Sequence, residues 1–134
     1  MHDMYRGAIL DHGTNPRNRG VLAPADVDYE TNNPLCGDNL RLTLRLDAAG
    51  CITAVGWDGE SCAITQAAAS LLGERIIGRS RDDIRQLCPQ DIYDMLGVPI
   101  PANRTQCALL SLKALTIALY GLDEWYRHED EDEV

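Results

Sequence analysis

The spacing of apolar residues changes once along this chain, near residue 61, and this change limits the folds that it can adopt. The run LRLTLRLD from Leu40 to Asp47 places a leucine at every second position, which predicts a half-buried strand. The segment 51–59, CITAVGWDG, follows a short turn and is expected to pair with that strand as a hairpin. The segment 26–32 is a further candidate strand.

Beyond residue 61 the apolar residues recur at helical spacing. The segment 61–78 is expected to form a helix that begins at Ser61 as its N-cap and ends at Gly78. The face predicted for this helix carries Ala63, Ala67, Ser70 and Leu71. The other expected helices are a short one near 4–12 stopped by Gly13, 81–87 capped by Ser80 and ended by Pro89, 90–97, and 105–122 with Thr105 as N-cap.

Strands followed by helices, without βαβ alternation, predict an α+β domain. We expect a small three-stranded antiparallel sheet with helices packed on one face, while its other face can remain polar and exposed. A length of 134 residues, with 45% hydrophobic and 25% charged residues, fits one domain over 1–134. Its acidic end, about 128–134, is expected to be solvated.

Charge and hydropathy exclude two classes of partner. The net charge of -9 has the wrong sign for binding a phosphate backbone, so no nucleic acid partner is expected. The chain has no apolar run near the roughly 20 residues that span a bilayer, and no secretion signal at its start. We therefore expect a soluble, cytoplasmic protein without a membrane partner.

The five cysteines include no CxxC pair, and in a reducing compartment they are expected to stay unpaired. Cys36 and Asp38 flank Gly37 in the turn-rich stretch NPLCGD. If this stretch is extended, the two side chains point to the same side, and the glycine lets the backbone come close to whatever they hold. The pair would then supply two ligands to a metal.

Two other cysteines fall at expected helix starts. Cys62 follows Ser61, and Cys107 comes two residues after Thr105, so the helix dipole would favour the thiolate form of each. Three thiolates and one carboxylate form a tetrahedral set that suits Zn²⁺ or iron in a sulfide cluster. Each of these cysteines alone would be interpreted as a small buried hydrophobic residue. Their joint placement favours the interpretation that they are metal ligands.

The remaining cysteines and the histidines carry no comparable signal. Cys51 and Cys88 are expected to fill space in the packing and not to bind a metal. The histidines, at positions 2, 12 and 128, do not complete a better site, and a Cys-His hydrolase has no signature here. His12, Asn15 and Arg17 could form a contact surface, although a helix stop explains them equally well.

Four motifs in the same order resemble those of the IscU/SufU family of iron-sulfur cluster assembly proteins, related to the N-terminal domain of NifU. The motifs are YRGAILDHGTNPRNRG, NPLCGD, GESCAIT followed by a small-residue helix, and QCALLSLKAL. The resemblance covers nearly the whole chain and implies a small antiparallel sheet covered by helices. It also implies a site made by Cys36, Asp38, Cys62 and Cys107 that holds a [2Fe-2S] cluster or Zn²⁺.

The chain combines features of two branches of this family. Gln106 stands where the IscU branch has a histidine, as in the SufU branch, yet the 45 positions between Cys62 and Cys107 resemble IscU, because SufU proteins usually carry an insertion there. The segment GVPIPANR differs from LPPVK, the IscU motif read by a dedicated chaperone, which makes dependence on that chaperone doubtful.

The resemblance implies two functions, of a scaffold or sulfur carrier rather than a stand-alone enzyme. The first is a scaffold that accepts sulfur from a cysteine desulfurase, builds a [2Fe-2S] cluster and passes it to recipient apoproteins. The second is a zinc-containing sulfur acceptor, a sulfurtransferase component that relays persulfide sulfur. By analogy with the scaffold branch, Cys107 is the first candidate for the persulfide acceptor, and by analogy with the acceptor branch, Cys36 is the second. A structural zinc module is a third reading, which the carboxylate disfavours because structural sites are usually closed by Cys and His.

Overall fold

The computed structural model describes residues 2–33 and 37–132, and describes side chains over 7–33 and 37–127. Its strands are β1 (Val27–Asn33), β2 (Asp38–Leu46) and β3 (Ile52–Asp58). Its helices are α1 (His2–Thr14), α2 (Ala63–Ile76), α3 (Arg81–Arg85), α4 (Pro89–Leu96), the 3₁₀ turn η1 (Ala102–Arg104), α5 (Thr105–Tyr120) and α6 (Leu122–Asp132). Within these ranges no helix is both long and apolar enough to cross a membrane.

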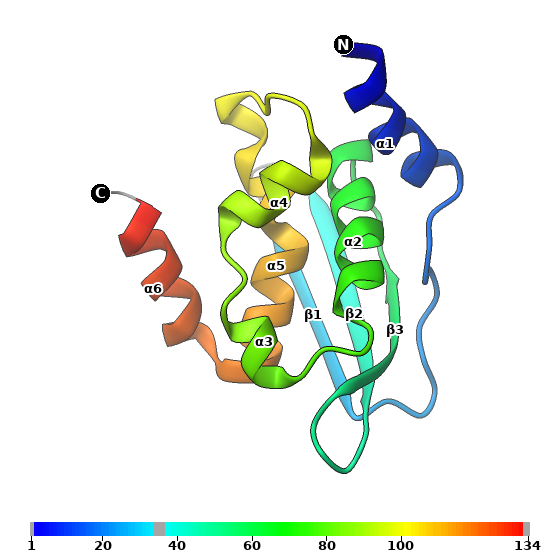
Figure 1. The fold of residues 1–134 in the computed structure, drawn as a ribbon, viewed down its shortest axis with the longest axis vertical. Coiled ribbons are helices and arrows are strands. Elements are labelled where there is room, and N and C mark those ends of the chain that lie inside the picture. Colours follow the sequence, from blue (N-terminus) through cyan, green and yellow to red (C-terminus); the bar gives the residue numbers. More distant parts are fainter. Residues whose placement is uncertain (1, 34–36, 133–134) are drawn as a thin grey trace.

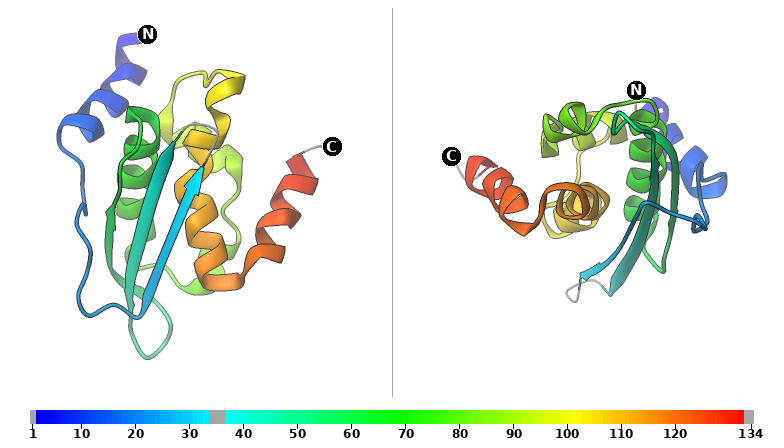
Figure 2. Two further views of the ribbon diagram at one scale, coloured as in Figure 1. Left: turned by 180° about the vertical axis from the view of Figure 1, so that it is seen from behind. Right: turned by 90° about the horizontal axis from the view of Figure 1, so that it is seen from below.

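The three strands form an antiparallel sheet in the order β1-β2-β3, which confirms the predicted α+β class. The alternating leucines of β2 lie on one face, where Leu40 and Leu44 are completely buried. Helices α2 and α5 cover this face side by side, α5 against β1 and β2 and α2 against β3 (Figures 1 and 2). The hydrophobic core lies between the sheet and these two helices.

The other face of the sheet is less open than the sequence predicted. Residues 18–22 run along β3, where Trp57 exchanges backbone hydrogen bonds with Asn18 and Gly20. The hydroxyl of Thr43 is completely buried beneath this segment and accepts a hydrogen bond from the Leu22 N–H at 3.0 Å. The expectation that this face can remain exposed therefore fails over β3 and part of β2, because an irregular segment has no periodicity that reveals where it packs.

Two predicted helix starts shift by one residue. Cys62, not Ser61, is the N-cap of α2, and Arg104, not Thr105, is the N-cap of α5. Thr105 is already helical because η1 leads directly into α5, and its hydroxyl donates to the carbonyl of Ala102 at 3.0 Å. Both cysteines predicted at helix starts nevertheless lie at the N-terminal ends of α2 and α5.

Other predicted details of the helices also change. Ser80 caps α3 as expected, but α3 ends at Arg85, and Pro89 occupies the first turn of α4 instead of ending a helix. On the predicted face of α2, Ala63 is exposed because it is the first residue of the helix. Further along, α2 packs against α1, α4, α5 and β3 and is buried around most of its circumference. Helix α6 was not predicted as a helix of its own.

Candidate metal centre

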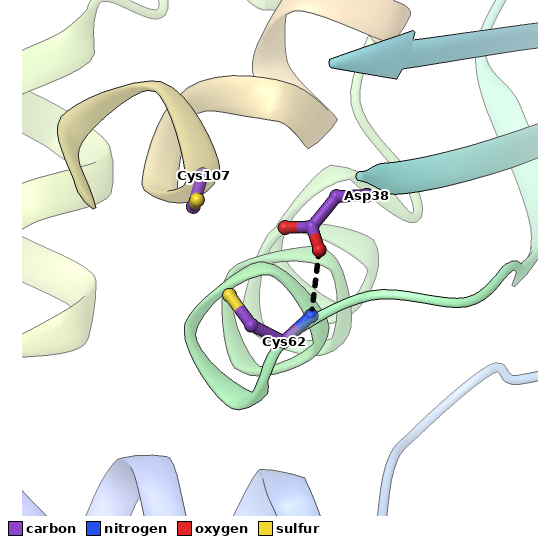
Figure 3. A group of neighbouring side chains, drawn as sticks. All are labelled: Asp38, Cys62 and Cys107. Carbon is purple, nitrogen blue, oxygen red and sulfur yellow. Dashed lines mark hydrogen bonds between the residues drawn. The ribbon is translucent and has the colours of Figure 1, made fainter. Parts of the chain in front are cut away.

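Three chain segments meet at the end of the sheet where β2 begins. Asp38 is the first residue of β2, Cys62 caps α2, and Cys107 lies in the first turn of α5 (Figure 3). Their possible ligand atoms all lie within 4.8 Å of one another. Asp38 and Cys107 are buried, with 5% and 1% of their surfaces exposed, while Cys62 is half-buried. The structure thus brings together three of the four residues predicted as ligands.

The carboxylate of Asp38 is held in place by α2. Its Oδ1 accepts a hydrogen bond from the backbone N–H of Cys62 at 3.0 Å, and its Oδ2 accepts one from the hydroxyl of Thr65 at 2.6 Å. Both donors belong to the N-terminal end of the helix, where backbone N–H groups lack partners within the helix and the helix dipole favours negative charge. The carboxylate is therefore fixed beside the two sulfur atoms.

The fourth predicted ligand, Cys36, lies outside the described residues. Its neighbour Gly37 adopts a left-handed conformation, with φ of 73°, and its N–H bonds to the carbonyl of Asn33 at 2.9 Å. The prediction that Gly37 continues an extended segment is therefore wrong, because the chain turns there. Only glycine adopts this conformation readily, so the glycine between Cys36 and Asp38 serves a turn.

The described side chains fit a metal ion that prefers sulfur and oxygen ligands. Two sulfur atoms bound to one zinc at about 2.3 Å lie roughly 3.8 Å apart, so atoms within 4.8 Å need to move by only about 1 Å. Two thiolates and a carboxylate leave one tetrahedral position, which a further thiolate or an exchangeable group can fill. The same donors suit iron in a sulfide cluster.

An arginine lies beside the two sulfur atoms. A hydrogen bond with the Cys107 side chain, followed by the charges that Cys62 and Cys107 carry as thiolates, raises the pKa of the Arg104 guanidinium. Arg104 itself is exposed and lines a pocket of about 560 Å³ that reaches Cys107. A guanidinium at this position offsets part of the negative charge that two thiolates and a carboxylate bring together.

Gln106, which stands at the histidine position of the IscU branch, faces the same pocket. Its side-chain oxygen accepts a hydrogen bond from the Asn33 amide at 3.2 Å. Asn33 of β1 is paired with Asp38 of β2 in the antiparallel sheet, so this bond joins the first turn of α5 to the end of the sheet that carries the site. An amide is a far weaker ligand than imidazole for zinc or iron, so Gln106 does not replace a histidine ligand.

Among the described residues, those that were predicted to lie outside the site are indeed outside it. Cys51 and Cys88 do not join the metal-binding group of the described residues. His12 is 6% exposed, and its Nδ1 lies 2.6 Å from the Ser70 hydroxyl. It joins α1 to α2, which favours the structural reading of this residue over a contact surface. The side chains of His2 and His128 lie outside the described residues.

Sequence reasoning missed two residues of the site, Thr65 and Arg104. Thr65 follows Cys62 by three positions, so a helix places both on one face, and this spacing was the available signal. Its partner Asp38, however, lies 27 positions away in a strand. Arg104 comes three positions before Cys107, but an irregular loop was expected there, so no helical spacing connected the two.

The NifU-like N-terminal domain family matches residues 4–127. The chain belongs to this family. The chain is 35% identical over 129 residues to the zinc-dependent sulfurtransferase SufU of Bacillus subtilis (strain 168), covering 84% of this chain and 86% of that protein. It is 32% identical over 116 residues to the iron-sulfur cluster assembly scaffold protein IscU of Aquifex aeolicus (strain VF5), covering 86% of this chain and 73% of that protein.

A solved structure agrees with the fold of this NifU-like domain. The crystal structure of a candidate SUF-system cluster assembly scaffold protein from Fervidobacterium islandicum AW-1 superposes with a TM-score of 0.76 and 26% identity. The match covers 88% of this chain and 98% of that one. Relatives named for cluster assembly and a relative named for zinc-dependent sulfur transfer thus share this domain, and both functions fit the chain.

Proposed function

We propose that this protein is an iron-sulfur cluster assembly scaffold. It accepts sulfur from a cysteine desulfurase, builds a [2Fe-2S] cluster on Cys36, Asp38, Cys62 and Cys107, and transfers the cluster to recipient apoproteins. The observation that carries this proposal is the convergence of Asp38, Cys62 and Cys107 from three separate elements, with all ligand atoms within 4.8 Å. Cys36 is included because it is two residues from Asp38 in the sequence.

The mixture of ligands supports a site that releases what it holds. Thiolates bind iron and zinc tightly, whereas a carboxylate is a harder and weaker ligand for both. Among the described ligands, Cys62 is half-buried and the pocket beside Cys107 reaches the surface. An incoming ligand from a recipient protein can approach the site from that pocket.

A second function, zinc-dependent sulfur transfer, is favoured by Gln106. The hydrogen bond from Asn33 engages the side-chain oxygen of Gln106, and the chain has no histidine at this position. A single Zn²⁺ needs no more than the four ligands proposed above. In this function Zn²⁺ occupies the site, and one of the cysteines leaves it to accept persulfide sulfur.

Metal analysis after anaerobic purification distinguishes the two functions. Iron and sulfide in equal amounts, with visible absorption bands of a [2Fe-2S] cluster, support the scaffold. Stoichiometric zinc without these bands supports the sulfur acceptor. The same protein is then incubated with a cysteine desulfurase, cysteine and ferrous iron, and cluster transfer to an apo-ferredoxin is followed by absorption.

Cys88→Ser is the matched control, because it removes a thiol that does not belong to the group formed by Asp38, Cys62 and Cys107. This variant should load metal and transfer clusters like the parent. Cys62→Ser should lose both. A protein that binds neither zinc nor iron after anaerobic purification and reconstitution would contradict both functions.

A further inference from the structure

Thr65 places a completely buried hydroxyl group at the centre of the candidate metal site. This oxygen lies 2.6 Å from Oδ2 of Asp38, 3.0 Å from the carbonyl oxygen of Cys107 and 3.4 Å from Sγ of Cys62. One side chain therefore touches all three of the described residues that could bind a metal. Nothing in the ligand chemistry requires a hydroxyl here, because oxygen of a neutral alcohol is a poor ligand beside thiolates.

The hydroxyl has one proton and three neighbours that can accept it: the Asp38 carboxylate, the Cys107 carbonyl and the sulfur of Cys62 at 3.4 Å. A charged carboxylate at 2.6 Å competes better for this proton than a neutral carbonyl at 3.0 Å, because hydrogen bonds to ionised acceptors are shorter and stronger. Thr65 therefore donates to Asp38. Since the Cys62 N–H donates to the other carboxylate oxygen, the hydrogen bonds at Oδ1 and Oδ2 prevent the carboxylate from rotating.

We propose that Thr65 is a positioning residue of the metal centre, an inference that rests on the metal binding in the proposed function. Its hydroxyl holds the Asp38 carboxylate beside the sulfur atoms before a metal arrives. Each carboxylate oxygen keeps lone pairs beyond those used by Thr65 and Cys62, so Asp38 can still bind a metal. Hydrogen-bond partners of metal ligands typically change metal affinity by about 10- to 100-fold when they are removed.

The matched substitutions are Thr65→Val, which keeps the shape and removes the hydroxyl, and Thr65→Ser, which keeps the hydroxyl. Zinc affinity is measured on metal-free protein by competition with a chromophoric chelator. Thr65→Val is expected to lower the affinity by about 10- to 100-fold, and Thr65→Ser to stay near the parent. Thr116→Val is the control, since Thr116 is also a buried helical threonine, 4% exposed, but not one of the residues around the metal group.

Cobalt(II) supplies a spectroscopic measurement that a purely structural role would leave unchanged. The intensity and position of its visible bands report the geometry of its ligands, so Thr65→Val is expected to alter the spectrum and Thr116→Val to leave it as in the parent. In an Asp38→Ala background, Thr65→Val is expected to have little further effect on zinc affinity, because the residue acts through the carboxylate.

The possible outcomes separate this inference from the proposed function. Parental zinc affinity and cobalt spectrum in Thr65→Val would overturn the role of Thr65 while metal binding by the parent stood. A full effect of Thr65→Val that persisted without Asp38 would also overturn it. A parent that bound no metal would overturn the proposed function itself. If Thr65→Val fails to fold, as judged by circular dichroism, Thr65→Ala must show the same loss of affinity.

Discussion

The carboxylate of Asp38 and the backbone N–H of Cys62 are joined by a 3.0 Å hydrogen bond, although 24 positions separate them in the sequence. This bond fixes one proposed ligand against the helix end that carries another, so much of the site is arranged by the fold. Pre-arranged ligands bind a metal more tightly because less motion is lost on binding. The consequences for the cysteines, for stability and for sulfur transfer can be tested separately.

Replacing Cys36, Cys62 or Cys107 with Ser is expected to lower zinc affinity by more than about 100-fold, because a hydroxyl oxygen is a poor substitute for a thiolate. Cys51→Ser and Cys88→Ser are expected to keep the parental affinity, since neither thiol belongs to the described metal-binding group. Chelator competition measures all five variants. Equal losses at all five positions would show that the assignment of ligands is wrong.

Bound metal is expected to raise the melting temperature, because the ligands come from a strand and two helix ends that only the folded chain brings together. At a free metal concentration 100 times Kd, the stabilisation is about 2.7 kcal/mol, which corresponds to a rise of roughly 10 °C for a chain of this length. Differential scanning calorimetry with and without zinc measures the shift. An unchanged melting temperature in protein shown to contain zinc would contradict a site formed by these segments.

The lowered pKa of His12 is expected to make the stability of the protein depend on pH. Burial lowers the pKa of His12 below its ordinary value of 6.5, and the nearby Arg17 contributes, while Glu74 and Asp11 oppose the shift. The unfolded chain therefore binds a proton more readily than the folded chain, so stability is lost as the pH falls below about 6.5. His12→Gln cannot titrate, and its melting temperature is expected to fall less between pH 7 and pH 5 than that of the parent. If the melting temperatures of the two proteins fell equally between pH 7 and pH 5, His12 would not be the cause of the loss of stability.

The sheet and the site differ in how far the sequence predicts them. Alternating leucines from Leu40 to Leu46 determine the face of β2 directly, because the period of a strand is two, and the structure confirms that strand. The contact between Thr65 and Asp38 depends on how α2 packs at the end of β2, which no local pattern encodes. From the sequence alone, a threonine at a buried position of a helix is interpreted as a packing residue, because its distant hydrogen-bond partner is not known.

Helix α6 illustrates a second limit. In this helix, LDEWYRHEDED, the apolar residues Leu122, Trp125 and Tyr126 share a helical spacing, but only Trp125 is buried among the residues with described side chains. Helix α6 packs against α5 and is joined to α3 by the ion pair of Glu124 with Arg85 at 3.0 Å, while the pair of Glu124 with Arg127 at 3.1 Å lies within α6. The pair between Arg85 and Glu124 links residues 39 positions apart, so local composition indicated only a charged tail.

A cysteine desulfurase is expected to transfer sulfur to Cys107 first, or to Cys36. In this step the thiolate attacks the outer sulfur of the desulfurase persulfide, that S–S bond breaks, and the desulfurase cysteine leaves as a thiolate. Cys107 is only 1% exposed, so the residues around its pocket, including Arg104, must move to admit the persulfide. Any bound metal must first release the attacking thiolate, because a metal-bound thiolate is a weaker nucleophile.

Mass spectrometry of peptides after reaction with the desulfurase and cysteine locates the added sulfur atom. Cys107→Ser and Cys36→Ser identify which of the two residues accepts it. Sulfur found only on Cys51 or Cys88 would refute the prediction.

Asp38→Ala tests whether the carboxylate opens the site. Three thiolates hold a soft or borderline metal firmly, while a carboxylate can be protonated or displaced, so Asp38 is the ligand through which a replacement ligand enters. The variant is expected to fold, to keep an assembled cluster longer, and to donate it to an acceptor apoprotein about tenfold more slowly. Equilibrium zinc affinity is a different quantity and falls in the same variant, because one ligand is lost.

Two measurements on Asp38→Ala decide the point. Circular dichroism of the metal-free variant shows whether it folds, and the decay of cluster absorption, with and without an apo-ferredoxin, gives retention and transfer rates. Asp38→Glu is the matched variant: it restores a carboxylate, and with it faster transfer than in Asp38→Ala. If Asp38→Ala instead transferred its cluster or sulfur at the parental rate with unchanged metal retention, the bonds from Cys62 and Thr65 to Asp38 would serve only to close the turn at Gly37 and to start α2.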